Sequence, residues 1–240
     1  MNDSISGSVT GEPGRIAICT AMGEEAAFFQ ALSTRASEPG IVGKASFQVL
    51  TIAGIEVLLV TSGIGLVNAA AAATIAITQF GATALISAGS AGGMGAEVQV
   101  GDVVIGTETQ YTFADATAFG HYVKGQVPQM PASYQTNPQL VNLLKSDGLR
   151  THLGAIISSD AFVTAHNFAA ISKDFPAAQA ADMETAAIAQ VAYLFGVPWV
   201  AVRGISDLCG PAAAEDFATH LDGAAALSAQ MVATLLAAGG

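Results

Sequence analysis

The chain has 240 residues, of which 52% are hydrophobic and 11% charged, enough for one large α/β domain or two small ones with a sizeable core. Its net charge of −11, with only 8 Lys and Arg, argues against a nucleic-acid partner, because binding to DNA or RNA depends on neutralised phosphates. No apolar run reaches the roughly 18 residues needed to span a membrane, so we expect no membrane partner either.

The first half of the chain predicts a leader followed by strands and one helix. Residues 1–14 lack the basic and apolar regions of a signal peptide, so we expect a disordered leader and a single domain over 15–240. Hydrophobic runs then predict a strand over 15–21, a hairpin of strands 47–52 and 55–61, a helix over 65–80 and a buried strand over 82–88. We expect Gly89 to Gly93 to form a flexible loop after that strand.

The second half predicts the same alternation around one long irregular segment. Residues 111–135 are rich in Gly, Pro and aromatics, which predicts an ordered loop. Hydrophobic patterns predict a strand that begins at Asp102, strands over 153–158, 178–181 and 198–205, and helices over 138–146, 167–173, 183–195 and 214–238. Strands that alternate with helices predict a mostly parallel sheet between two helical layers.

Polar residues follow the predicted strands, at the points where sites form in sheets of this kind. Parallel strands bring their carboxyl ends to one edge of the sheet, where ligands bind. The acids at these points are Glu24, Glu25, Asp160, Asp182, Glu184 and Asp207. Glu24, Glu25, Asp182 and Glu184 could simply begin helices, and Asp207 could cap a helix or pair with Arg203. A carboxylate is nevertheless costly in an apolar pocket unless it has a partner or a task. Paired acids at one rim suit acid–base cleavage of a glycosidic bond.

Other motifs in the chain are weaker. Residues 63–68, GIGLVN, resemble a dinucleotide-binding turn, but Asn68 replaces the third Gly and no acidic residue lies about 20 positions further on. The Gly89–Gly93 stretch has no Lys or Arg beside it to pair with a phosphate. Cys19 and Cys209 are far apart and the His residues are scattered, so we expect no disulfide framework, no metal, no cofactor, and a reducing cytoplasm.

Eight stretches, in order along residues 15–210, together resemble the 5′-methylthioadenosine/S-adenosylhomocysteine nucleosidases of the nucleoside phosphorylase type I superfamily. They are AMGEE at 21–25, SGIG at 62–65, AGSAGG at 88–93, VGDVV at 100–104, DATAFG at 115–120, SDAF at 159–162, DMETAAIA at 182–189 and RGISD at 203–207. The resemblance implies a single-domain three-layer α/β/α sandwich around a mixed, mostly parallel central sheet. It also implies hydrolysis of the N-ribosidic bond of 5′-methylthioadenosine, S-adenosylhomocysteine and 5′-deoxyadenosine, without a cofactor.

The resemblance implies catalytic roles for three of the acids. Glu25 matches the residue that orients and activates the attacking water. Asp207 matches the general acid that protonates N7 of adenine, with Ser206 beside it. Glu184 matches the residue that binds the ribose hydroxyls, and Arg203 matches a position near the water and Glu25.

The resemblance also implies the walls of a nucleoside pocket. Phe162 matches the ring that stacks on adenine, and the backbone of Val163 matches the group that reads the edge of the base. The other implied substrate-binding residues are Ser90, Ala91 and Gly92 under the sugar and base, Met183 on the sugar, Ile64 and Phe217 around the 5′-alkylthio group, and Met22. Phe119 and Pro128 match residues that a second subunit lends to this pocket, so the resemblance implies a homodimer.

The chain departs from the family pattern at three places. Gly23 occupies a position where the family pattern has an acid. Asp182 occupies a position where the pattern has the longer Glu, and we expect it to be structural. Residues 208–211, LCGP, replace the usual continuation after Asp207. Three alternatives use the same fold: a purine or uridine phosphorylase, a futalosine hydrolase, and a nucleoside-binding protein without catalysis. A phosphorylase would need arginines for phosphate, where this chain has Glu24, Glu25, Ile64 and Asn68.

Overall fold

The strands and helices lie close to the predicted positions. The computed structural model describes residues 15–144 and 148–239, so the predicted leader over 1–14 and the end of the predicted helix over 138–146 lie outside the described residues. The strands are β1 (Arg15–Thr20), β2 (Arg35–Ala36), β3 (Gly40–Val42), β4 (Ala45–Ile52), β5 (Ile55–Thr61), β6 (Ala82–Gly93), β7 (Val103–Tyr111), β8 (Tyr134–Gln135), β9 (Thr151–Ser158), β10 (Ala178–Asp182) and β11 (Trp199–Asp207). The helices are α1 (Gly23–Leu32), α2 (Leu66–Thr78), α3 (Pro138–Leu143), α4 (Phe168–Asp174), α5 (Thr185–Phe195) and α6 (Ala213–Gly239), with a short 3₁₀ helix η1 (Thr117–Phe119).

The eleven strands form one mixed sheet, and part of this sheet closes on itself. The strand order is β10-β9-β7-β11-β6-β1-β5-β4-β2, with β3 beside β4 and β8 beside β7. The neighbours β5, β1, β6 and β11 run parallel to one another, and so do β7, β9 and β10. Because β10 also pairs with the end of β6, the strands β6, β11, β7, β9 and β10 form a closed ring. The predicted mixed, mostly parallel central sheet is confirmed.

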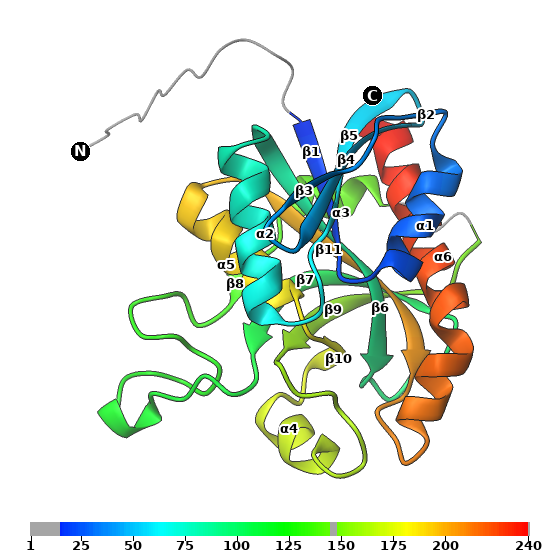
Figure 1. Ribbon diagram of the computed structural model, residues 1–240. Coiled ribbons are helices and arrows are strands. Elements are labelled where there is room, and N and C mark those ends of the chain that lie inside the picture. Colours follow the sequence, from blue (N-terminus) through cyan, green and yellow to red (C-terminus); the bar gives the residue numbers. More distant parts are fainter. Residues whose placement is uncertain (1–14, 145–147, 240) are drawn as a thin grey trace.

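Helices cover both faces of the sheet. Figure 1 shows α1 and α6 on one side of it and α2 and α5 on the other. Successive side chains of a strand point to opposite faces, so Leu85 and Ala201 belong to the core under α2 and α5, whereas Ile86 and Val202 belong to the core under α1 and α6. These two cores, separated by the sheet, confirm the predicted three-layer α/β/α arrangement.

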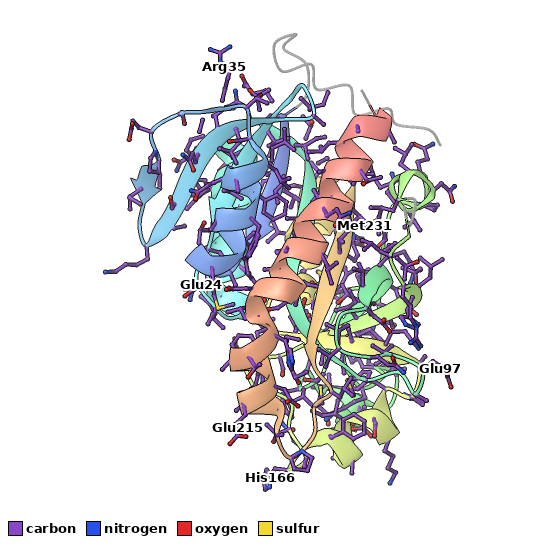
Figure 2. All side chains as sticks on the ribbon, turned by 90° about the vertical axis from the view of Figure 1, so that its right-hand side faces the viewer. Glu24, Arg35, Glu97, His166, Glu215 and Met231 are labelled. Carbon is purple, nitrogen blue, oxygen red and sulfur yellow. The ribbon has the colours of Figure 1, made fainter. Side chains whose placement is uncertain are left out.

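Helix α6 lies along the sheet for most of the length of the domain. Figure 2 shows this helix with Glu215 near one end and Met231 in the opposite half. By length and composition alone α6 could cross a membrane, but core helices pass the same test. Here Ala224, Ser228 and Val232 are buried, and the helix packs against β11 and β6. The buried side of α6 therefore forms one wall of the core.

The structure corrects the prediction for residues 89–93, which end strand β6 and do not form a flexible loop. Their small side chains led to the loop prediction, but backbone pairing holds them from both sides. β11 pairs with Gly89 to Gly92, and β10 pairs with Gly92 and Gly93. Small residues are needed here because space is short: a Cβ atom on Gly93 would lie 2.9 Å from side-chain atoms of Val98 and Leu208.

Residues 111–135 are mostly irregular, as predicted, with three short exceptions, of which the 3₁₀ helix η1 is one. Strand β7 continues to Tyr111, and Tyr134–Gln135 form the short strand β8 beside it. The hairpin predicted around residues 53 and 54 is present, with Ile52 opposite Ile55 in the antiparallel pair β4–β5. Strands β2 and β3, which sequence patterns did not predict, are only two and three residues long. Helix α1, which is ten residues long, was expected only in the alternative that Glu24 and Glu25 begin a helix.

Gly204 in β11 offers a test of the packing between the sheet and α6. A Cβ atom at this position would overlap the backbone carbonyl group of Ala224 on α6. We expect Gly204→Ala to lower the free energy of unfolding by about 1–3 kcal/mol, the usual cost of overpacking. Urea denaturation followed by circular dichroism measures this change.

The matched control for this test is Gly223→Ala, next to Ala224 on the same helix, where an added Cβ meets nothing within 4 Å. Because Ala has a higher helix propensity than Gly, this change should raise the free energy of unfolding by up to about 1 kcal/mol. Equal effects of the two substitutions would contradict the close approach of α6 to β11.

Candidate active site

A cavity of about 290 Å³ lies at the carboxyl ends of β1, β6, β10 and β11. The sequence-predicted residues that line it are Met22, Glu25, Ile64, Ser90, Ala91, Gly92, Phe162, Val163, Met183, Glu184, Ser206, Asp207 and Phe217. Segments that are far apart in the sequence thus meet around one volume, as expected where the carboxyl ends of parallel strands converge.

Glu25 is held in one orientation by four hydrogen bonds. It lies in the first turn of α1, and its Oε2 accepts from the backbone N–H groups of Ala21 at 2.9 Å and Met22 at 3.2 Å. Its Oε1 accepts from the backbone N–H and the hydroxyl of Ser90, at 2.9 and 3.0 Å. The carboxylate fits because Gly89 has no side chain, since a Cβ atom there would overlap it. Gly89 also has a φ of 145°, which glycine adopts readily.

Asp207 lies at the end of β11 and is 1% exposed. The Ser206 hydroxyl donates to its Oδ2 at 3.0 Å, and the backbone N–H of Cys209 donates to its Oδ1 at 2.9 Å. Burial raises the pKa of the Asp207 carboxyl above its usual range, although these two hydrogen bonds oppose the change. An acid with a raised pKa can retain a proton at a pH where an exposed Asp has lost it.

Glu184 connects β10 to α5 and faces the same cavity. Its Oε1 accepts a hydrogen bond of 3.0 Å from the backbone N–H of Gly65, and its Oε2 lies 3.6 Å from Arg203 Nη1. Burial raises the pKa of Glu184 to about 7; the Arg203 charge opposes this rise, and the Asp182 charge adds to it. The site therefore holds acids in different environments, which is the arrangement that separates acid from base roles.

Arg203 lies behind the wall of the cavity and is not part of its lining. The resemblance implies a position near the attacking water and Glu25, but the guanidinium is 1% exposed and reaches Glu25 through Ser90, whose carbonyl accepts from Nη1 at 3.3 Å. Its main partner is the carboxylate of Asp182, with Nη2 and Oδ2 2.9 Å apart. Opposite charges in a buried, low-dielectric place attract strongly, which accounts for this orientation.

Aromatic rings form the wall of the cavity opposite the strand ends. Phe162 and Phe217 meet edge to face, with ring centroids 5.8 Å apart. Phe162 is 38% exposed, so one of its faces can take a planar ligand. Gly92 closes the floor, since a Cβ atom there would lie 3.0 Å from Asp207 Oδ1 and 2.5 Å from Cys209 Sγ.

Phe119 and Pro128 lie outside this cavity. Both belong to residues 112–133, which Figure 1 shows in green as a loop that projects from the rest of the molecule, with η1 at its outer part. The Phe119 side chain is 70% exposed. Neither residue lines the cavity of its own chain, so a role in substrate binding would require a second copy.

The sequence analysis did not predict five residues that line the cavity: Ala21, Ala161, Ala181, Cys209 and Ala214. Small apolar side chains carry no chemical signal, and only their positions next to predicted site residues could have indicated them. Asp182, expected to be structural, also reaches the lining. No three of the His, Cys, Asp and Glu residues in the described part of the chain lie together as a metal site would require.

Comparison with known proteins agrees with the family resemblance of the sequence. Residues 15–237 match the Phosphorylase superfamily. The 5′-methylthioadenosine/S-adenosylhomocysteine nucleosidase of Halalkalibacterium halodurans is 39% identical over 227 residues, which cover 92% of this chain and 97% of the relative.

Solved structures resemble this chain over nearly its whole length. The 5′-methylthioadenosine/S-adenosylhomocysteine nucleosidase of Neisseria meningitidis, in complex with methylthio-immucillin-A, superimposes with a TM-score of 0.90 at 38% identity and covers 94% of this chain and 99% of its own. The futalosine hydrolase of Helicobacter pylori strain 26695 gives a TM-score of 0.87 at 26% identity, covering 93% and 97%. The chain therefore belongs to the phosphorylase superfamily and, within it, to the family of 5′-methylthioadenosine/S-adenosylhomocysteine nucleosidases.

Proposed function

We propose that this chain hydrolyses the N-ribosidic bond of 5′-methylthioadenosine and S-adenosylhomocysteine, and also of 5′-deoxyadenosine, and releases adenine. The observation that carries this proposal is that three buried acids from different elements, Glu25, Glu184 and Asp207, face one cavity beside the ring of Phe162. The names of the relatives support it, as does the methylthio-immucillin-A bound to the relative from N. meningitidis.

Departure of the base is assigned to Asp207. Without protonation, adenine would leave as an anion, which is a poor leaving group. Its departure therefore needs a general acid that still holds a proton near neutral pH. Burial raises the pKa of Asp207, and Ser206 and Cys209 fix its orientation. Transfer of its proton to N7 of adenine can contribute about 10²- to 10⁴-fold to the rate.

The other two acids act on the sugar and the water. The N-ribosidic bond breaks through an oxocarbenium-like state, with positive charge on the ribose. Glu184, ionised above its pKa of about 7, binds the ribose hydroxyls and stabilises that charge. Glu25 accepts a proton from the attacking water, whose oxygen bonds to C1′. One proton has then moved from Asp207 to adenine and another from water to Glu25, so the atoms balance.

The cavity lining argues against a phosphorylase. A phosphorolytic site needs cationic groups for phosphate, but the lining formed by the described residues contains neither Lys nor Arg. Arg203 is buried behind the wall and already faces two carboxylates. Futalosine hydrolysis is the second candidate, because the H. pylori enzyme shares the fold at 26% identity, which is lower than the 39% of the nucleosidase from H. halodurans.

The proposed working unit is a homodimer in the cytoplasm. Phe119 is 70% exposed and Phe113 is 58% exposed on the projecting loop, and Ile64 and Val67 beside the cavity are 50% and 76% exposed. Exposed apolar side chains near a site favour a partner surface. Both cysteines, Cys19 and Cys209, are free and buried, as is usual in a reducing compartment.

The reaction type can be tested by measuring adenine release from 5′-methylthioadenosine with and without inorganic phosphate. We expect the same rate in both conditions and a free 5-methylthioribose product, because water is the proposed nucleophile. Strict dependence on phosphate, with a ribose 1-phosphate product, would show that the enzyme is a phosphorylase. Faster cleavage of futalosine than of the three adenosine substrates would favour the second candidate.

The role of Asp207 can be tested with Asp207→Asn, which keeps the shape of the side chain but cannot donate an acidic proton. We expect kcat to fall by about 10²- to 10⁴-fold, while a substrate analogue such as methylthio-immucillin-A still binds measurably by calorimetry. The control is Asp222→Asn, an exposed acid further along α6, which should leave kcat unchanged. A wild type as inert as the variant would favour the non-catalytic binding protein.

The contribution of a second subunit can be tested with Phe119→Ala. If Phe119 reaches the neighbouring cavity, KM for 5′-methylthioadenosine should rise by roughly tenfold, since fully burying a Phe side chain contributes about 1.5–3 kcal/mol. Ile41→Ala, which changes an apolar side chain 67% exposed on β3, serves as the control. A fully active monomer in sedimentation velocity at assay concentration is the outcome that rejects the dimer.

A further inference from the structure

Two acids compete for the one buried guanidinium of the site, and they are placed unequally. Asp182 Oδ2 lies 2.9 Å from Arg203 Nη2, whereas Glu184 Oε2 lies 3.6 Å from Arg203 Nη1. The side chains of Arg203 and Asp182 are each 1% exposed, and that of Glu184 is 6% exposed. At such burial the shorter distance marks the dominant pairing, so Asp182 balances most of the arginine charge.

Asp182 is fixed in this position from several sides. Its Oδ1 accepts from the Ser158 hydroxyl at 2.5 Å and from the backbone N–H groups of Glu184 and Thr185 at 3.3 and 3.2 Å. Its Oδ2 accepts from the Thr185 hydroxyl. The same carboxylate therefore accepts from backbone N–H groups at the start of α5 and pairs with Arg203.

Further hydroxyl groups hold Arg203 on the side of Asp182. Nη2 donates to Ser87 Oγ at 2.7 Å and to Thr185 Oγ1 at 3.1 Å, and these two hydroxyls lie 2.9 Å apart. Nη1 donates to the carbonyl of Ser90. The guanidinium is thus oriented by the hydroxyls of Ser87 and Thr185 and by a backbone carbonyl, and its approach to Glu184 stays limited.

Glu184 retains capacity for a ligand as a result. Its Oε1 takes one backbone N–H, from Gly65, and its Oε2 has only the 3.6 Å approach to Arg203. The charged groups that act on Glu184 are Arg203, Asp182 and Glu25, and behind Arg203 lies the thiol of Cys19. A carboxylate bound to Arg203 through two close hydrogen bonds would have to break them before it could accept from ribose hydroxyls.

We propose that Asp182 is a positioning residue that takes up the charge of Arg203 and thereby leaves the Glu184 carboxylate available to the sugar. Binding of the ribose hydroxyls by Glu184 rests on the proposed nucleosidase function. The arrangement of the charges of Arg203, Asp182 and Glu184 does not depend on that function. Asp182 thus has a specific task beyond starting α5, at a position where its short side chain departs from the longer Glu of the family pattern.

The direct test is an infrared titration of the Glu184 carboxyl group, identified by its loss in Glu184→Gln, in wild type and in Asp182→Asn. In the wild type the midpoint should lie near the pKa of about 7. The Asp182→Asn substitution removes one of the two negative charges that face Arg203. Glu184 is then the remaining carboxylate partner of Arg203, so it binds its proton less tightly. The midpoint should fall by roughly one pH unit or more, the usual effect of an adjacent arginine. An unchanged or higher midpoint would overturn the proposal.

Kinetics give the second measurement, with 5′-methylthioadenosine as substrate. In Asp182→Asn, kcat should fall by roughly tenfold to a hundredfold, because Arg203 draws Glu184 away from the sugar, and the rising limb of kcat/KM with pH should move down with the infrared midpoint. Asp182→Glu keeps the charge. It should keep the infrared midpoint of Glu184 and the midpoint of the rising limb of kcat/KM near those of wild type. If the wild type does not cleave the substrate, the nucleosidase function fails, while the infrared midpoint still decides the role of Asp182.

A matched control separates positioning from general loss of a buried ion pair. Asp102 is also buried, and its Oδ2 lies 3.5 Å from Arg150 Nε and 2.8 Å from His152 Nε2, outside the cavity lining. Asp102→Asn should lower the midpoint of thermal unfolding without moving the Glu184 titration. Should Asp182→Asn not fold, Thr185→Val loosens Asp182 and keeps its charge. It should shift the Glu184 midpoint in the same downward direction by less, and no shift would count against the proposal.

Discussion

The guanidinium of Arg203 lies between β6, β11 and the start of α5, where it is 1% exposed and contacts polar groups from β6 and α5. Burying a positive charge is costly unless it is paired and hydrogen-bonded, and a half-satisfied arrangement costs more than an apolar one. The acids and hydroxyls around Arg203 are therefore constrained together, since they supply the partners of its Nη1 and Nη2. The positions of Glu25 and Glu184 follow from this constraint, the first through Ser90 and the second through the shared cation.

The closed part of the sheet provides the frame that this constraint requires. Because β10 pairs with both β9 and β6, the segment that carries Asp182 and Glu184 is fixed relative to the strand that carries Ser87 and Ser90. The missing side chains at Gly89 and Gly204 then leave room for the carboxylate of Glu25 and for the backbone of α6, respectively. Rigid strands and missing side chains together place carboxylates that no flexible loop would hold at such distances.

Apart from α1 and the short strands β2, β3 and β8, the sequence predicted the strands and helices in order, and it also predicted the edge of the sheet at which the site forms. These features depend on local hydrophobic pattern and on the general geometry of parallel strands, so they can be read without tertiary information. The end of β6 could not be predicted in this way, because its glycines are extended by pairing with β10 and β11, which come from the other half of the chain. The partners of the Arg203 guanidinium could not be predicted for a related reason, since they are the carboxylate of Asp182 and hydroxyls on β6 and α5.

The same closure has a consequence for how copies of this protein can associate. Strands that end a sheet expose unpaired backbone groups, and long flat ones recruit other chains into aggregates. In the described part of the chain the outermost strands are β2, β3 and β8, which are two, three and two residues long, and β10 is occupied on both sides. At these strands, contact between copies would depend on side chains, whose shape and polarity can select a partner, and not on continuation of the sheet, which accepts almost any extended strand.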